Sequence, residues 1–377
     1  MARSLEPLRS WSDDPIVRAV ARHALPGTEN APPPLSGWER ALPLIAAQGL
    51  AGLALDLLAR CDRPAPASLI DGLQERHRGD VVHVARLITE LVRLLDRLRP
   101  RGIRPVVLKG PAVAQTAYRR SSWRPYSDLD LLVAPDERFE LAAALRASGF
   151  DRHRPPPRPG FDERFAKAVV HRRPDGLEFD VHRALADGPV PLRIPLPELL
   201  QHATTLPIGD RTARRLDDTR LFLHACIHAA LGDPSPRALA LRDVAQIAWS
   251  MDVRWDLADA LAERWRLHAV VRHAIVRAAG RLDVGLPEAA GELAGRDVTR
   301  RDARVLAAYV TDRRYRGARQ LEMLRALPGI HERAAYAAAL LLPRRDFLTA
   351  REGAVRHPAA ARLRRLTRAA LMPGGSR

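Results

Sequence analysis

Three aspartates on two predicted strands are the residues of this sequence whose types and spacing best suit chemistry. Asp128 and Asp130 stand two apart in an apolar run, so the alternation of side chains along a strand puts both carboxylates on one face. Asp180 lies on a later apolar strand, where the same alternation gives it a face in common with His182. Carboxylates this close repel each other unless a cation neutralises them. The cluster therefore predicts a Mg²⁺ site, and two such ions could activate an attacking oxygen and stabilise a leaving pyrophosphate.

A lysine and a glycine end the strand that precedes these aspartates. Lys109 and Gly110 follow a short apolar run, and a glycine at a strand-to-helix turn lets backbone N–H groups come close to a phosphate. Only two of the 61 basic residues are lysines, Lys109 and Lys167, and the others are arginines. A compact ammonium differs from a guanidinium as a phosphate partner, so Lys109 is a candidate phosphate ligand. Lys167 has no motif around it.

The elements that must position these residues follow from hydrophobic periodicity and from turn residues. The centre of the chain predicts strands at 104–108, 127–133, 166–172 and 177–182, with helices at 111–119 and 135–148. Helices at 38–60 and 68–99 precede this part, and a succession of helices from 217 to 342 follows it. We therefore expect an α+β fold with a small mixed β-sheet, N-terminal helices and a large helical C-terminal region.

Changes in composition divide the chain into five predicted segments. These are a flexible lead-in at 1–36, an N-terminal helical region at 37–100, the α/β core at 101–215, a helical C-terminal domain at 216–343 and a basic C-terminal segment at 344–377. With 46% hydrophobic residues the chain is not globally disordered, and two cysteines exclude a disulfide scaffold. The N-terminus has no apolar signal segment, and no apolar stretch reaches the ~18–20 residues of a membrane span. We expect a cytoplasmic protein with no membrane partner.

The sequence around the aspartates resembles a known family. The residues that carry the resemblance are Val107-Leu108-Lys109-Gly110, then Tyr118 and Arg124, then Ser127-Asp128-Leu129-Asp130-Leu131-Leu132-Val133, and later Phe179-Asp180-Val181-His182. This pattern is similar to the nucleotidyltransferase fold of the DNA polymerase β superfamily. More narrowly, it resembles a nucleotidyltransferase-like family whose members are often encoded beside genes for ribosomal peptide natural products such as lasso peptides. The resemblance runs from about residue 38 to 343 and is strongest over 106–182.

The resemblance implies a role for each matching residue. The implied metal ligands are Asp128, Asp130 and Asp180, and Asp180 would also help to deprotonate the acceptor. The implied nucleotide contacts are Lys109, Gly110, Arg124, Ser127 and His182. For His182, a hydrogen-bonded structural role is an equal alternative. The implied reaction transfers a nucleoside monophosphate from an NTP, with ATP as the default donor, to a small molecule, a peptide or a protein side chain. Pyrophosphate is released, and a role in tailoring peptide natural products would fit.

One departure from the superfamily pattern keeps a second hypothesis open. The superfamily usually has Gly-Ser or Gly-Gly at the phosphate turn, whereas this chain has Gly110-Pro111, and proline lacks an N–H donor. This favours, as an alternative, a catalytically weak nucleotidyltransferase fold that acts as a binding or regulatory module. The formal net charge of +17 supports a third alternative, an RNA-modifying nucleotidyltransferase. However, the arginines are dispersed and have few aromatic residues among them, so nucleic acid is a weakly supported partner.

Two further pairs of polar residues lie on predicted C-terminal helices. His224 and His228 are four residues apart, which is metal-ligand spacing, but the glutamate of the HExxH motif is absent. We expect these histidines to pack in the core or to support the site. Arg242 and Asp243 resemble a family position that packs towards the cleft, and we expect them to form ordinary ion pairs.

Overall fold

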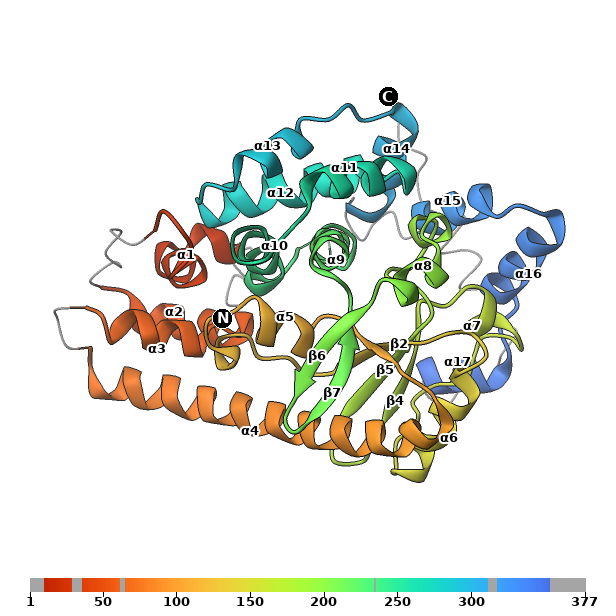
Figure 1. Ribbon diagram of the computed structural model, residues 1–377, viewed down its shortest axis with the longest axis horizontal. Helices are drawn as coiled ribbons and strands as arrows, with labels where there is room; N and C mark the ends of the chain where they lie inside the picture. The colour runs from red at the N-terminus through yellow and green to blue at the C-terminus, as the bar shows by residue number, and fades with distance from the viewer. Residues whose placement is uncertain (1–9, 29–35, 62–64, 234, 311–316, 353–377) are drawn as a thin grey trace, which may run out of the picture.

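The computed structural model describes residues 10–28, 36–61, 65–233, 235–310 and 317–352, which form an α+β fold with one mixed sheet between helical layers (Figure 1). The seven described strands are β1 (Val106–Val107), β2 (Leu129–Leu132), β3 (Asp151–Arg152), β4 (Ala168–Arg172), β5 (Glu178–His182), β6 (Thr204–Ile208) and β7 (Arg211–Arg215). Their order across the sheet is β3-β4-β5-β2-β1-β7-β6. The β2 strand pairs antiparallel with β1 and parallel with β5. The expected fold class is confirmed.

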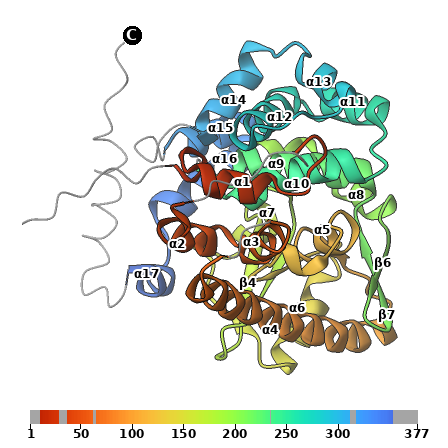
Figure 2. The same cartoon turned by 90° about the vertical axis from the view of Figure 1, so that its left-hand side faces the viewer.

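Helices cover the sheet on both sides. The long helix α4 (Ala67–Leu98) and α6 (Arg138–Ala147) lie below the sheet, while α9 (Asp218–Leu231) and α10 (Ala238–Ser250) lie above it (Figures 1 and 2). The α4 helix buries Leu87, Leu91, Leu94 and Leu98, whose spacing of three to four residues makes one apolar face. Phe150, which follows α6, packs edge-on against Phe179 of β5 with ring centroids 4.9 Å apart. The polar residues of β5 therefore face the other helical layer.

The N-terminal part differs from two predictions. We predicted a flexible lead-in, but its described residues form a short 3₁₀ turn (Trp11–Asp13) and α1 (Pro15–Arg22), which buries Ile16, Val17 and Val20. Residues 1–9 and 29–35 lie outside the described part. The predicted helix at 38–60 is two helices, α2 (Trp38–Gln48) and α3 (Ala51–Leu58). They separate at Gly49, whose φ of +72° is a left-handed conformation that ends a helix.

The remaining helices lie between the strands in the sequence and then continue to the end of the described chain. They are α5 (Pro111–Thr116), α7 (Phe161–Arg164), α8 (Leu196–Gln201), α11 (Trp255–Arg264), α12 (His268–Leu282), α13 (Glu288–Ala294), α14 (Arg300–Val310), α15 (Ala318–Ala326), α16 (Ile330–Leu341) and α17 (Arg345–Glu352). Short 3₁₀ turns lie at Arg99–Arg101, Ser121–Trp123 and Val190–Arg193. One cluster of buried apolar side chains extends from Trp11 to Tyr309. The division into separate domains stays a prediction, and most of the predicted segment 344–377 lies outside the described residues.

The β6–β7 hairpin is an element that the sequence pattern did not predict. Pro207 lies within β6, and a proline normally argues against a strand. The hairpin nevertheless pairs over five positions, and β7 runs parallel to β1 with Val107 opposite Arg215. Asp217 then caps α9 by accepting a hydrogen bond from the Arg220 backbone N–H. The hairpin therefore places the start of α9 at the end of β7, the neighbour of β1 in the sheet.

Candidate functional site

The pairing of β2 with β5 brings the predicted carboxylates together. Asp130 lies directly beside Asp180 in the parallel register. A ligand atom from each of Asp130, Asp180 and His182 lies within 4.8 Å of the others, and the same holds for Asp128, Glu178 and Asp180. Asp180 therefore belongs to both groups, one with Asp130 and the other with Asp128. The oxygen-rich donor set fits a hard cation such as Mg²⁺.

Asp130 is the most firmly held of the three aspartates. Its side chain is almost fully buried, and it accepts from the Lys109 ammonium at 2.9 Å and contacts His182 Nε2 at 2.7 Å. The other ring nitrogen, His182 Nδ1, lies 3.0 Å from the carbonyl oxygen of Ala184. Burial alone would raise the pKa of Asp130, but Lys109 and His182 outweigh it and hold that pKa well below its usual range. Asp130 is therefore a permanent anion of the site.

Asp180 has the opposite environment. Its Oδ1 atom is buried and has no hydrogen-bond partner among the described residues. Burial, together with the negative charges of Asp130 and Asp128, raises the pKa of Asp180 to about 6. A buried carboxylate oxygen without a donor is costly unless a ligand supplies the missing interaction. A cation held by Asp180 and its neighbouring carboxylates would supply that interaction.

Lys109 and Gly110 form the turn at the edge of this cluster. Gly110 has φ +49° and ψ −114°, a conformation that L side chains rarely adopt, and a Cβ atom there would come within 3.4 Å of the Tyr126 ring. Burial lowers the pKa of Lys109, but Asp130 and Asp128 raise it by more, so this lysine stays cationic. Its ammonium therefore lies against the aspartates at 2.9 Å from Asp130, and the phosphate contact expected of Lys109 and Gly110 stays a prediction.

A cavity of about 590 Å³ opens beside the cluster, and Asp128 and Asp130 line it whereas Asp180 and His182 do not. Among its lining residues are Lys109, Gly110, Arg124, Ser127, Asp128, Asp130, Lys167, His228 and Arg237. Ser127 Oγ lies 3.4 Å from Asp128 Oδ1, and the Ser127 carbonyl oxygen contacts His83 Nε2 of α4 at 3.1 Å. A volume of this size is within the usual range for small-molecule sites.

Arg124 lines the cavity, but its guanidinium also belongs to a buried network. Its Nη2 atom donates to Asp243 Oδ2 at 2.7 Å, and the Tyr118 hydroxyl donates to Asp243 Oδ1 at 2.8 Å. Arg242, the neighbour of Asp243, donates instead to the carbonyl of Ala21 at 2.6 Å. The ion pair expected for Asp243 is therefore present and joins α10 to the loop before β2. The phosphate contact expected of Arg124 stays a prediction.

The two histidines of α9 lie close enough to the cluster to feel its charges, His224 buried and His228 half-buried along the cavity. Burial lowers the pKa of His224 to about 3, with Lys109 adding to the effect, and burial and Lys109 also hold the pKa of His228 well below its usual range. Neither belongs to a candidate metal group among the described residues. Both are therefore neutral near pH 7, and their part in packing or in support of the site stays a prediction.

Lys167 is the residue of the cavity that motif analysis missed. It directly precedes β4, and continuing the alternation of that strand would put it on the face of Val169, away from Asp180. The structure instead places its side chain along the cavity with Lys109. The scarcity of lysine was the one signal in the sequence that could have found it.

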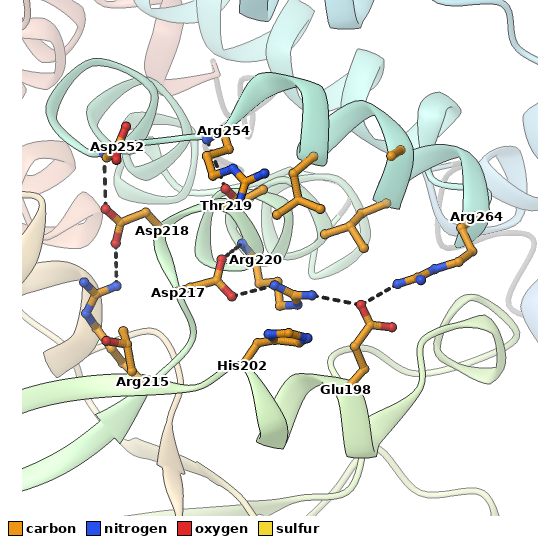
Figure 3. Close-up of a pocket in the computed structure, with 14 residues that line it drawn as sticks. Glu198, His202, Arg215, Asp217, Asp218, Thr219, Arg220, Asp252, Arg254 and Arg264 are labelled. Atoms are coloured by element: carbon orange, nitrogen blue, oxygen red, sulfur yellow. Dashed lines mark hydrogen bonds and ion pairs between the residues drawn. The ribbon is translucent and has the colours of Figure 1, made fainter.

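A larger cavity of about 970 Å³ lies at the other end of α9 (Figure 3). Asp217 and Asp218, at the start of α9, line this cavity, whereas His228 near the end of the helix lines the candidate site. At a rise of 1.5 Å per residue, Asp218 and His228 are about 15 Å apart along the helix. Its charged groups pair with each other, as Arg220 does with both Asp217 and Glu198 at 2.8 and 2.9 Å. Because these described charged groups neutralise each other, they do not form a cluster of like charges that would call for a cation. The 590 Å³ cavity is therefore the better candidate for a catalytic site.

The candidate site thus brings the carboxylates of two neighbouring strands next to a lysine–glycine turn. The family model described as uncharacterised nucleotidyltransferase matches residues 34–283, and the chain belongs to this family. The chain is also similar to a crystal structure of an antigenic nucleotidyltransferase-like protein from Paracoccidioides brasiliensis. The identity is 19% and the TM-score 0.30, over 49% of this chain and 91% of that chain. No curated protein matches the sequence. Among the described helices, none is long and apolar enough to cross a membrane.

Proposed function

We propose that this protein is a Mg²⁺-dependent nucleotidyltransferase that transfers a nucleoside monophosphate from an NTP, with ATP as the default donor, to an acceptor and releases pyrophosphate. The observation that carries the proposal is the carboxylate of Asp180, which lies beside Asp130 in the sheet and has a buried oxygen with no donor in the described part of the chain. The acceptor would be a small molecule, a peptide or a protein side chain. The family resemblance favours a peptide natural product.

In this proposal the carboxylates of Asp128, Asp130 and Asp180 would hold the metal. When bound, the metal would neutralise the carboxylates and stabilise negative charge on the phosphates. The acceptor oxygen would form a bond to the α-phosphorus while the bond from that phosphorus to the bridging oxygen breaks, and pyrophosphate leaves with the bonding electron pair. Asp180 would accept the acceptor's proton.

Lys109 would contribute positive charge at the phosphates. Its ammonium already lies 2.9 Å from Asp130 Oδ2, so it is fixed at the border between the carboxylates and the cavity. The usual backbone contact at the phosphate turn is reduced here because Pro111 has no N–H to donate. Side-chain cations would therefore have to supply more of the phosphate binding than in a Gly-Ser turn.

Incubation of the purified protein with each α-labelled NTP, Mg²⁺ and candidate acceptors tests the proposal. We expect label transfer that is abolished by EDTA and by Asp128→Ala and Asp130→Ala, but is retained in Asp210→Ala, a control at an exposed aspartate. Absence of nucleotide binding at every Mg²⁺ concentration would refute the proposal. Binding without transfer to any acceptor would favour the regulatory-module alternative, and label in RNA would favour the RNA-modifying one.

A further inference from the structure

The cations that line the 590 Å³ cavity differ in whether they already have a partner. Five basic residues line it, and three of them form ion pairs: Arg76 with Asp80 at 3.0 Å, Lys109 with Asp130 at 2.9 Å and Arg124 with Asp243 at 2.7 Å. Within the described part of the chain, Lys167 and Arg237 form neither an ion pair nor a side-chain hydrogen bond. Arg237 is exposed, whereas Lys167 is half-buried.

The backbone fixes Lys167 at the carboxylate end of the cavity. Its carbonyl accepts from the backbone N–H groups of Arg183 at 2.8 Å and Ala184 at 3.2 Å, which extends the pairing of β4 with β5 by one residue. The ammonium is close enough to act electrostatically on Asp180 and on His224 and His228 of α9. It is nevertheless not in contact with a carboxylate in the described residues, so its charge remains available to a ligand.

The composition of the chain supports a specific requirement for lysine here. Five of the 61 basic residues line the cavity, and both lysines of the protein are among them. If two lysines were distributed at random over the basic positions, both would fall in this cavity about once in 180 arrangements. A lysine is a compact, strongly hydrated point charge, while the planar guanidinium of arginine prefers forked pairing with an anion. The cavity therefore holds two compact cations in a protein that otherwise uses arginine.

We propose that Lys167 binds the β- and γ-phosphates of the nucleotide and the pyrophosphate that leaves. This inference rests on the proposed function and deepens it by assigning a second phosphate cation that no family motif contains. Lys109 is paired with Asp130, and the turn has one backbone donor fewer because Pro111 has no N–H, so the terminal phosphates need another positive group. Lys167 is the half-buried cation of the described cavity that has no carboxylate partner.

Binding of ATP, ADP, AMP and inorganic pyrophosphate, measured without metal and with Ca²⁺, tests this assignment. The variants are Lys167→Met, which keeps the side-chain length without the charge, Lys167→Arg, and the control Arg237→Met at the exposed cation. We expect Lys167→Met to weaken ATP and pyrophosphate binding about tenfold or more, and to change AMP binding less than threefold. Lys167→Arg should restore part of the lost affinity, and Arg237→Met should have a smaller effect than Lys167→Met. Circular dichroism should give the same spectrum for all four proteins.

The possible results separate this inference from the proposed function. A wild-type protein that binds ATP, with a Lys167→Met variant that binds it equally well, would overturn the assignment of Lys167 and leave the proposed function intact. Equal loss of ATP and AMP binding would also overturn it, because a lysine that only balances the charge of Asp180 would affect both ligands. A wild-type protein that binds none of these ligands would overturn the proposed function and this assignment together.

Discussion

Replacement of Asp180 by asparagine should stabilise the metal-free protein above pH 6 and at the same time remove the proposed activity. The asparagine side chain has nearly the same volume as that of aspartate but carries no charge. In the wild-type protein, burial and the charges of Asp130 and Asp128 raise the pKa of Asp180 to about 6, and its Oδ1 atom has no donor among the described residues. The carboxylate is therefore a source of instability that a bound cation would relieve.

The size and sign of this effect follow from the two pKa values. Asp180 has a reference pKa of 3.8, which represents the unfolded chain, so between 3.8 and about 6 the folded state holds a proton that the unfolded state has lost. Stability therefore falls as the pH rises through that window, and the full cost remains above it. A difference of about two pKa units corresponds to about 3 kcal/mol as an upper value. At about 2.1 cal/mol/K of unfolding entropy per residue, this raises the Tm of a chain of this length by about 4 °C.

Thermal unfolding in EDTA at pH 4 and at pH 7.5 measures this effect. The Tm of Asp180→Asn should match that of the wild type at pH 4 and exceed it at pH 7.5, while Asp210→Asn at an exposed position should do neither. Saturating Mg²⁺ should then raise the Tm of the wild type more than that of the variant, since about 2.7 kcal/mol is gained at a hundredfold excess over Kd. A variant that is less stable than the wild type at pH 7.5, or whose advantage is independent of pH, would refute the reasoning.

Three other substitutions test the surroundings of the site. Lys109→Met should lower the unfolding free energy by about 3 kcal/mol in urea titrations, because it leaves the buried Asp130 with one partner fewer; an unchanged free energy would contradict this. Asp243→Asn should cost about 3–4 kcal/mol in the same assay, since the buried Arg124 guanidinium loses its counter-charge at 2.7 Å. A cost under about 1 kcal/mol would show that the network is not needed. Gly110→Ala should cost about 1–2 kcal/mol because φ is +49°, and a wild-type Tm would disprove the strain.

The sequence predicted the individual strands and helices of the site better than it predicted which strands pair with each other. Alternation along a strand is a local property, so the shared face of Asp128 and Asp130 could be derived from the residues alone. The register that sets Asp130 beside Asp180 depends on contacts between segments about 50 residues apart, and the family resemblance was needed to connect them. The β6–β7 hairpin was missed because Pro207 and a polar composition conceal a strand that tertiary pairing nevertheless stabilises.

Residues that reach the site from outside the motif could not be assigned from sequence. His224 and His228 face the cluster only because α9 packs across the sheet, and Asp243 meets Arg124 through the packing of α10. Hydrophobic periodicity predicts the apolar face of such a helix, but it does not predict which polar side chain of the helix contacts a given strand. For Lys167 the strand pattern was misleading, and only the composition of the chain pointed to it.

Asp130 and Asp180 differ in whether a lysine already pairs with them, and this difference bears on how a metal ion and a nucleotide would bind. Lys109 already neutralises Asp130, so a divalent cation and Lys109 would compete for that carboxylate. Asp180 has no such competitor within hydrogen-bond distance of its Oδ1 atom among the described residues. Asp180 and Asp128 would therefore hold a cation without competition from Lys109, and Asp130 would become available as a ligand if the phosphates drew the Lys109 ammonium away. Nucleotide and metal would then bind cooperatively. The nucleotide would release Asp130 from Lys109 for the metal, and the metal would neutralise the carboxylates, which otherwise repel the phosphates.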